Sequence, residues 1–162
     1  MYKNNDAVFE RNLLGISSAD RGSQDLQIQL CSKSDTQKFS ALIDANNDLD
    51  KIKRNESEIR VLLKSRQHRL RALALQSLGN LPSLTSQTLE AVINTVSDPD
   101  ITVRRCAVDC LRPGSSDDGL IIHVLSELLL DPSAGVTAAA ATSLERFPDL
   151  PKSLRQNALA IL

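Results

Sequence analysis

The sequence predicts an all-α fold, a right-handed α-solenoid of about three stacked helix pairs. The main observation is a motif of one apolar residue, three others, Ala, three others and Leu, which occurs three times at a spacing of 33 residues. Its copies are Leu70–Ala74–Leu78, Val103–Ala107–Leu111 and Val136–Ala140–Leu144. A spacing of four places the three side chains on one helix face. The second observation is that the chain is 41% hydrophobic but only 2% aromatic, which suits closely stacked helices with aliphatic cores.

The N-terminal part of the chain differs from the repeats. Residues 1–34 are rich in Asn, Ser, Asp and Gln, and we expect a polar, partly ordered segment with short helices near 7–14 and 24–30. Ala41 lies 33 residues before Ala74 and is followed by Leu42 and Ile43. Because terminal repeats are commonly atypical, residues 35–47 are predicted to form either a cap or a degenerate unit.

The first repeat unit is predicted at residues 48–80. Its first helix is expected from about Leu49 to Leu63, and its second helix ends at Gly79. A turn near Ser65 stands where the later units have Asp-Pro.

The second and third units, at residues 81–114 and 115–148, share one plan. Each has a first helix with an apolar stripe, an Asp-Pro turn and a second helix that is closed near a Pro. Pro cannot continue a helix but suits the start of the next one, and a neighbouring Asp caps that start. The second helices are expected at about 100–111 and 136–144.

Residues 149–162 match the first helix of a further unit. Leu154, Ala158, Leu159 and Leu162 form its apolar stripe. We expect Leu159 and Leu162 to be half covered, and a fully buried Leu is worth about 1.5–3 kcal/mol. Either this helix is the cap of the solenoid, or a partner, self-association or the remainder of a longer solenoid covers the stripe.

Composition and charge exclude several classes of protein. The net charge of −1 gives no global attraction to nucleic acid or to an anionic membrane. No segment approaches the roughly 20 apolar residues of a membrane span, so no membrane partner is expected. Three cysteines form no disulfide framework, and residues 1–12 lack the apolar core of a secretory signal. We therefore expect a cytoplasmic protein with reduced thiols.

No set of residues predicts catalysis or metal binding. Cys106 and Cys110 lie four residues apart and form at most half of a zinc site, while His68 and His123 fall in different units. The sequence contains neither a Gly-x-Ser-x-Gly turn nor a Gly-rich phosphate loop. We expect no catalytic residue, no cofactor, no metal and no enzyme activity.

The repeated segments resemble HEAT-like repeats of the short bacterial type, also known as PBS-lyase-like repeats, over about residues 49–162. The resemblance rests on two segments, Asp98-Pro99-x3-Val103-Arg104-x2-Ala107-x3-Leu111 and Asp131-Pro132-x3-Val136-x3-Ala140-x3-Leu144. The resemblance implies a buried ladder between units, in which Arg71, Arg104, Asp98 and Asp131 take part. Thr137 stands where the third unit would carry the ladder Arg.

The resemblance also implies a range of functions. Most members of the family are adaptors or assembly scaffolds, and a few are bilin lyases, alkyl-purine DNA glycosylases or deoxyhypusine hydroxylases. The last group holds iron with His-Glu pairs, whereas the histidines here are followed by Arg69 and Val124. No residue specifically indicates a bilin-lyase role.

Two features predict a binding surface. Residues 51–71 carry eight Lys or Arg against two Glu, so the chain is electrically polarised. In addition, the second helices place outward residues side by side at steps of 33, on the face that is concave in most such solenoids. The residues that we expect to contact a partner are Lys64, Arg66, Arg69, Gln76, Arg105, Asp109 and Arg112.

Two functional hypotheses follow. The first is a non-catalytic scaffold or adaptor that binds another protein through the concave face and the adjacent basic patch. The alternative is a nucleic-acid-binding module, with a DNA-glycosylase-like fold, that uses the basic run from Lys51 to Arg71. The alternative requires that the Arg side chains line one continuous face, with an aromatic or a carboxylate in its middle.

Overall fold

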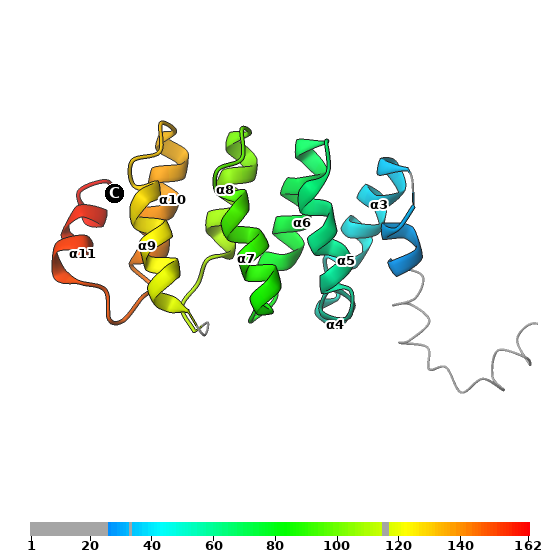
Figure 1. The fold of residues 1–162 in the computed structure, drawn as a ribbon, viewed down its shortest axis with the longest axis horizontal. Coiled ribbons are helices and arrows are strands. Elements are labelled where there is room, and N and C mark those ends of the chain that lie inside the picture. The colour runs from blue at the N-terminus through cyan, green and yellow to red at the C-terminus, as the bar shows by residue number, and fades with distance from the viewer. Residues whose placement is uncertain (1–25, 33, 115–116) are drawn as a thin grey trace, which may run out of the picture.

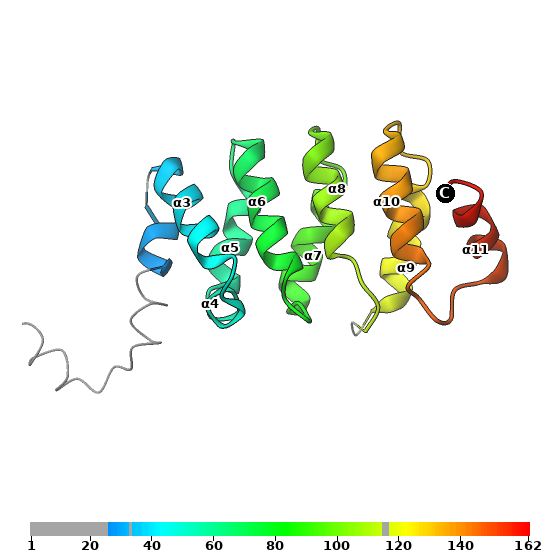
Figure 2. The same ribbon diagram turned by 180° about the vertical axis from the view of Figure 1, so that it is seen from behind.

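The computed structural model describes residues 26–32, 34–114 and 117–162, which form helices joined by turns, without a strand. The helices are stacked in a single row (Figures 1 and 2), so the predicted all-α solenoid is confirmed. Their bounds are α3 (Asp35–Ala45), α4 (Leu49–Arg54), α5 (Glu56–Val61), the 3-10 helix η1 (Leu62–Lys64), α6 (His68–Gly79), α7 (Ser86–Thr95), α8 (Ile101–Cys110), α9 (Asp118–Leu128), α10 (Ala134–Leu144) and α11 (Lys152–Leu159). Residues 26–30 are also helical.

The stack has two layers. Helices α6, α8 and α10 lie side by side and form one layer, here termed the B-helix face (Figure 2). Helices α5, α7 and α9, with η1, form the other layer, here termed the A-helix face (Figure 1). Within the stack α6 packs on α8, α8 packs on α10, and α3 packs on α6. The layers matter for function because they present two separate surfaces.

The repeated motif forms the core of the stack, as predicted. All nine side chains of its three copies have zero solvent exposure. The central Ala of each copy lies between neighbouring helices, where a methyl group lets the backbones approach closely. The 33-residue spacing therefore reflects the burial of one stripe per unit.

The starts of the B helices keep the same spacing. Gln67, Asp100 and Ser133 are the N-cap residues of α6, α8 and α10. The Asp100 carboxylate accepts hydrogen bonds from the backbone N–H groups of Thr102 and Val103, at 2.9 and 3.1 Å. This satisfies two N–H groups that the helix itself leaves unpaired.

The first unit departs from its predicted form. A single helix from Leu49 to Leu63 is wrong, because α4 ends and α5 begins at Asn55. The backbone of Asn55 is not helical, with φ −110° and ψ 22°, and its side-chain amide donates to the Lys51 carbonyl at 2.9 Å. Asn side chains compete in this way with the helical hydrogen bonds of the backbone, and apolar periodicity does not reveal it.

Helix α11 covers the C-terminal side of the stack only in part. Ala158 is buried, whereas Leu159 and Leu162 are 55% and 63% exposed. Arg155 fixes the helix by donating to Glu145 at 3.3 Å and to the Phe147 carbonyl at 3.1 Å. The expectation that a partner or another solenoid segment covers the exposed Leu side chains stays a prediction.

Some sequence expectations fall outside the described residues. The predicted helix near 7–14 lies there, as does most of the segment 1–34. Among the residues that the structure does describe, no helix combines the length and the apolar content needed to cross a bilayer.

Candidate functional site

A groove runs between α8 and α10 on the B-helix face. Its volume is about 390 Å³. It is lined by Arg105, Asp109, Gly135, Ala138, Ala139, Thr142, Ser143 and Arg146. Four of these residues lie on one face of α10, and their small side chains make a shallow floor: Gly135, Ala138, Ala139 and Thr142.

The charges of this groove lie at its sides. Arg105 and Asp109 come from α8, and Arg146 follows the end of α10. Neither guanidinium group makes a hydrogen bond or a salt bridge with a residue in the described ranges. Two guanidinium groups and one carboxylate therefore line the groove, and the excess of positive charge suits a ligand that brings its own carboxylates.

One buried hydroxyl in the groove lacks a partner. Ser143 is only 1% exposed, and its Oγ atom makes no hydrogen bond to any residue that the structure describes. The equivalent side chains of the preceding units are paired: Cys110 Sγ donates to the Leu75 carbonyl, and Ser77 Oγ donates to the Leu73 carbonyl. A buried polar group without a hydrogen bond costs about 1–3 kcal/mol, so this hydroxyl is a local weak point in the packing of α10.

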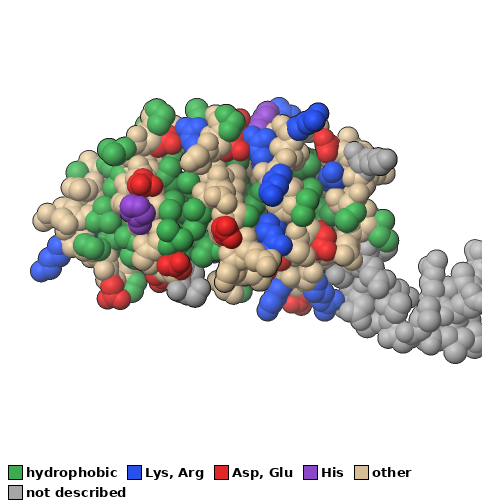
Figure 3. All heavy atoms as spheres, viewed as in Figure 1, with side chains coloured by type: hydrophobic (Ala, Val, Ile, Leu, Met, Phe, Trp, Pro, Cys, Tyr) green, Lys and Arg blue, Asp and Glu red, His purple; other side chains and the backbone are tan. Residues whose placement is uncertain are grey.

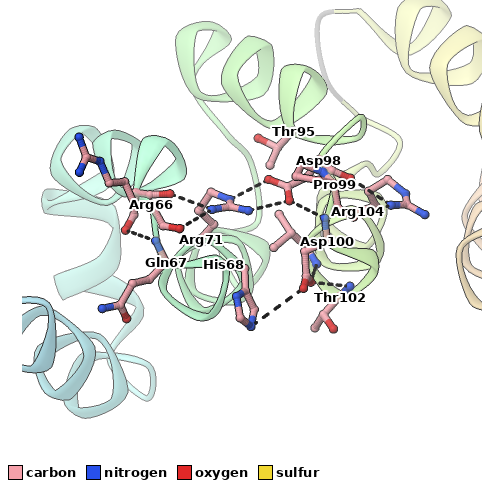
Figure 4. Close-up of polar contacts among 12 residues, drawn as sticks. Arg66, Gln67, His68, Arg71, Thr95, Asp98, Pro99, Asp100, Thr102 and Arg104 are labelled. Atoms are coloured by element: carbon pink, nitrogen blue, oxygen red, sulfur yellow. Dashed lines mark hydrogen bonds and ion pairs between the residues drawn. The ribbon is translucent and has the colours of Figure 1, made fainter.

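The structure places the predicted partner-binding residues on more than one surface. Arg105 and Asp109 line the groove between α8 and α10. Arg66 lies in the turn before α6, where its side chain points away from the neighbouring polar contacts (Figure 4), and Arg69 lies in the first turn of α6. Lys64 lies in η1 and lines a different groove, on the A-helix face.

The remaining two predicted residues already have contacts inside the protein. Gln76 donates to Cys106 Sγ at 3.9 Å. Arg112 donates to the carbonyl of Asp109 at 3.3 Å and to that of Gly79. They border the B-helix face but are less available to a ligand than Arg105.

Sequence reasoning missed Arg146 and Ser143. Arg146 lies beyond the end of α10, at the position of Pro113 in the preceding unit. A comparison limited to the outward-facing residues of the second helices therefore does not include it. Ser143 lies 33 residues after Cys110, which contacts α6 from α8. The repeat spacing would therefore have predicted that Ser143 lies between α8 and α10.

The Arg–Asp ladder implied by the family resemblance is present (Figure 4). Arg71 donates to both carboxylate oxygens of Asp98 at 2.7 Å and to the Ser65 carbonyl at 2.8 Å. Arg104 likewise donates to both oxygens of Asp131, at 2.8 and 3.0 Å, and to the Asp98 carbonyl at 3.0 Å. Each Arg thus ties the turn of its own unit to the turn of the next one, which is a structural role.

These contacts shift the pKa values of the ladder. Burial alone would raise the pKa of Asp98, but hydrogen bonds from Arg71 and from the Asp100 backbone N–H outweigh it, and the pKa is lowered. The hydrogen bonds from Arg104 lower the pKa of Asp131. Both carboxylates therefore stay ionised at neutral pH, as an ion pair requires.

The cysteines and histidines do not form a reactive centre in the described part of the chain. Burial raises the pKa of Cys110 to about 12 and also raises that of Cys106, so both remain thiols at neutral pH. His68 lies 4.0 Å from Asp100, and His123 lies 3.6 Å from Glu127. Residues 26–32, 34–114 and 117–162 contain no group of three or more metal-ligating side chains.

Known proteins resemble this chain in both sequence and fold. A family model described as HEAT repeats matches residues 57–145. A HEAT repeat-containing taxis protein of Halobacterium salinarum is 29% identical over 108 residues, which are 66% of this chain and 26% of the relative. The chain thus spans about a quarter of that relative's length.

Two crystal structures of engineered proteins share the fold. They superpose with TM-scores of 0.61 and 0.63 at 18% and 17% identity. Each match covers 86% of this chain, and 67% or 69% of the engineered protein. Because the family model matches more than half of the residues, this chain belongs to the HEAT repeat family.

Proposed function

We propose that this protein is a non-catalytic, cytoplasmic adaptor that binds a partner protein on its B-helix face. HEAT repeats generally mediate protein–protein interaction. The observation that carries the proposal is the groove between α8 and α10, where Arg105 and Arg146 have no ion-pair partner among the described residues.

The groove suits a helix or an extended segment of the partner. Gly135, Ala138 and Thr142 give a floor of small side chains, on which the backbone of such a segment lies close to α10. Carboxylates of the segment would bind Arg105 and Arg146.

The distribution of the cations favours a protein over a nucleic acid. The alternative needs Arg side chains on one continuous face, but Lys64 lies on the A-helix face while Arg105 and Arg112 lie on α8 and just beyond it. The described aromatic residues are Phe39, which is half-buried, and Phe147, which is 2% exposed. Neither offers an open platform for stacking bases.

An affinity capture from the lysate of the source cell tests the proposal. The wild type is compared with Arg105→Glu/Arg146→Glu, with Arg66→Glu/Arg69→Glu and with the control Lys53→Glu/Lys152→Glu, each with and without nuclease. We expect a nuclease-resistant protein that the groove variant loses and the control retains, with weaker capture by the Arg66/Arg69 variant. Recovery of nucleic acid alone, or equal capture by the groove variant and the control, would contradict the proposal.

A further inference from the structure

A second groove lies on the A-helix face, between α5, η1 and α7. Its volume is about 660 Å³, which falls in the usual range for ligand sites. Its lining includes Arg60 and Lys64 on one side and Gln87, Glu90, Ala91 and Asn94 of α7 on the other. It lies in the layer of helices opposite to the groove of the proposed function.

The first wall of this groove is positively charged. Lys and Arg side chains cross the A-helix face over α4, α5 and η1 (Figure 3). Arg60 and Lys64 belong to this basic stripe, and neither side chain makes a hydrogen bond or a salt bridge with a described residue. The stripe therefore presents cations that no neighbouring carboxylate pairs with directly.

Two acidic side chains of the same segment, Glu56 and Glu58, accept hydrogen bonds inside the fold. Glu56 is 8% exposed, and its Oε1 atom accepts hydrogen bonds from the backbone N–H and the hydroxyl of Thr85, both at 2.8 Å. Glu58 accepts from Gln27 and from Ser57, both at 2.7 Å. Because the hydrogen bonds of both carboxylates come from neutral groups, the donors of Arg60 and Lys64 remain available to a ligand.

The second wall has a different chemistry. Gln87, Glu90, Ala91 and Asn94 are spaced as one face of α7. The two amides offer donors and acceptors to a peptide backbone. Val61, which is 64% exposed, and Ala91 offer an apolar surface between the amides and the cations.

We propose that this second groove binds an acidic, extended segment of a partner protein. Carboxylates of the segment pair with Arg60 and Lys64, an aliphatic side chain packs on Val61 and Ala91, and its backbone bonds to the amides of α7. With one groove in each layer, the protein can hold two partners at once. This inference stands independently of the B-helix groove, since the two share no residue.

A peptide segment fits this groove better than a phosphate backbone does. Glu90 lies on the second wall and Glu58 lies near Arg60, and these carboxylates would repel an unbroken row of phosphates. A peptide avoids this repulsion, because its carboxylates are separated by neutral residues.

A binding titration with defined probes tests the inference. The probes are a short fluorescent peptide that alternates Glu and Val, the same peptide with Gln in place of Glu, and a fluorescent thymidine oligonucleotide. They are titrated with the wild type, with Arg60→Glu/Lys64→Glu, and with the matched control Lys53→Glu/Lys152→Glu, whose two residues line neither groove. A third variant, Glu90→Lys, removes the repulsive carboxylate, and circular dichroism checks that each variant is folded.

The acidic peptide is expected to bind about tenfold more weakly to Arg60→Glu/Lys64→Glu than to the wild type, with little change in the control. It should bind about threefold more tightly to Glu90→Lys, a gain that unfolding cannot produce. Absence of binding to the wild type would overturn the inference. Equal losses in the two double variants, or tighter binding of the oligonucleotide than of the peptide, would also overturn it.

Discussion

At the scale of single residues, two arginines join the repeat units, whereas others are exposed for binding. Arg71 and Arg104 are each 12% exposed and hold the carboxylates of the next unit in two-pronged hydrogen bonds. Arg105, the next residue along α8, points into the groove and has no ion pair among the described residues. Neighbours in the sequence therefore have different roles because a helix turns them to different sides.

Removal of one ladder arginine should destabilise the fold. Arg104→Met leaves the Asp131 carboxylate, whose side chain is only 6% exposed, without its charged partner. Breaking a buried ion pair in this way costs about 3 kcal/mol in the free energy of unfolding. Urea denaturation measures the loss, with Arg105→Met as the control, which should stay within about 0.5 kcal/mol of the wild type. Equal stabilities of the two variants would argue against the ladder.

The ladder also predicts a loss of stability in acid. The pKa values of Asp98 and Asp131 are lower in the folded state than in the unfolded chain, where the pKa of Asp is about 3.9. Their contribution is therefore complete above that pH and is lost as the pH falls from there through the lowered folded pKa values. Urea midpoints should fall across this window in the wild type, and less steeply in Arg71→Met/Arg104→Met. Parallel pH profiles would contradict the linkage.

At the scale of the elements, the stacking of α6, α8 and α10 depends on their small core residues. Ala107 has zero exposure and lies where α8 meets its neighbours. Ala107→Leu forces extra methyl groups into this contact and should cost about 1–3 kcal/mol, which thermal unfolding detects. Ala134→Leu adds the same atoms at an exposed position and serves as the control. An unchanged melting temperature for Ala107→Leu would mean that the motif does not face the core.

The sequence predicted the elements better than it predicted the site. The repeated motif identified the buried stripe, because burial in every unit imposes the same spacing on Leu70, Val103 and Val136. The break at Asn55 was missed, because it arises from a side-chain amide that bonds to the backbone rather than from apolar periodicity. The density of charge from Lys51 to Arg71 could not show that Lys64 would face the layer opposite to Arg105.

At the scale of the whole molecule, the two layers give the protein two grooves of different character. The groove on the B-helix face has a floor of small residues between two arginines, and the groove on the A-helix face has a cationic wall opposite an amide wall. A solenoid of this kind keeps both faces in a fixed relation, because each unit packs directly on the next. This arrangement suits an adaptor, which has to hold its partners without changing them.

Site-specific photo-cross-linking in the source cell tests the central claim most directly. A photoreactive amino acid replaces Thr142, which is exposed in the groove of the B-helix face, or Glu127, an exposed control on α9. The proposed function predicts a protein adduct at position 142 that survives nuclease, disappears in the Arg105→Glu/Arg146→Glu background and is absent at position 127. An adduct at 142 that nuclease removes, equal adducts at both positions, or no adduct at 142 would contradict it.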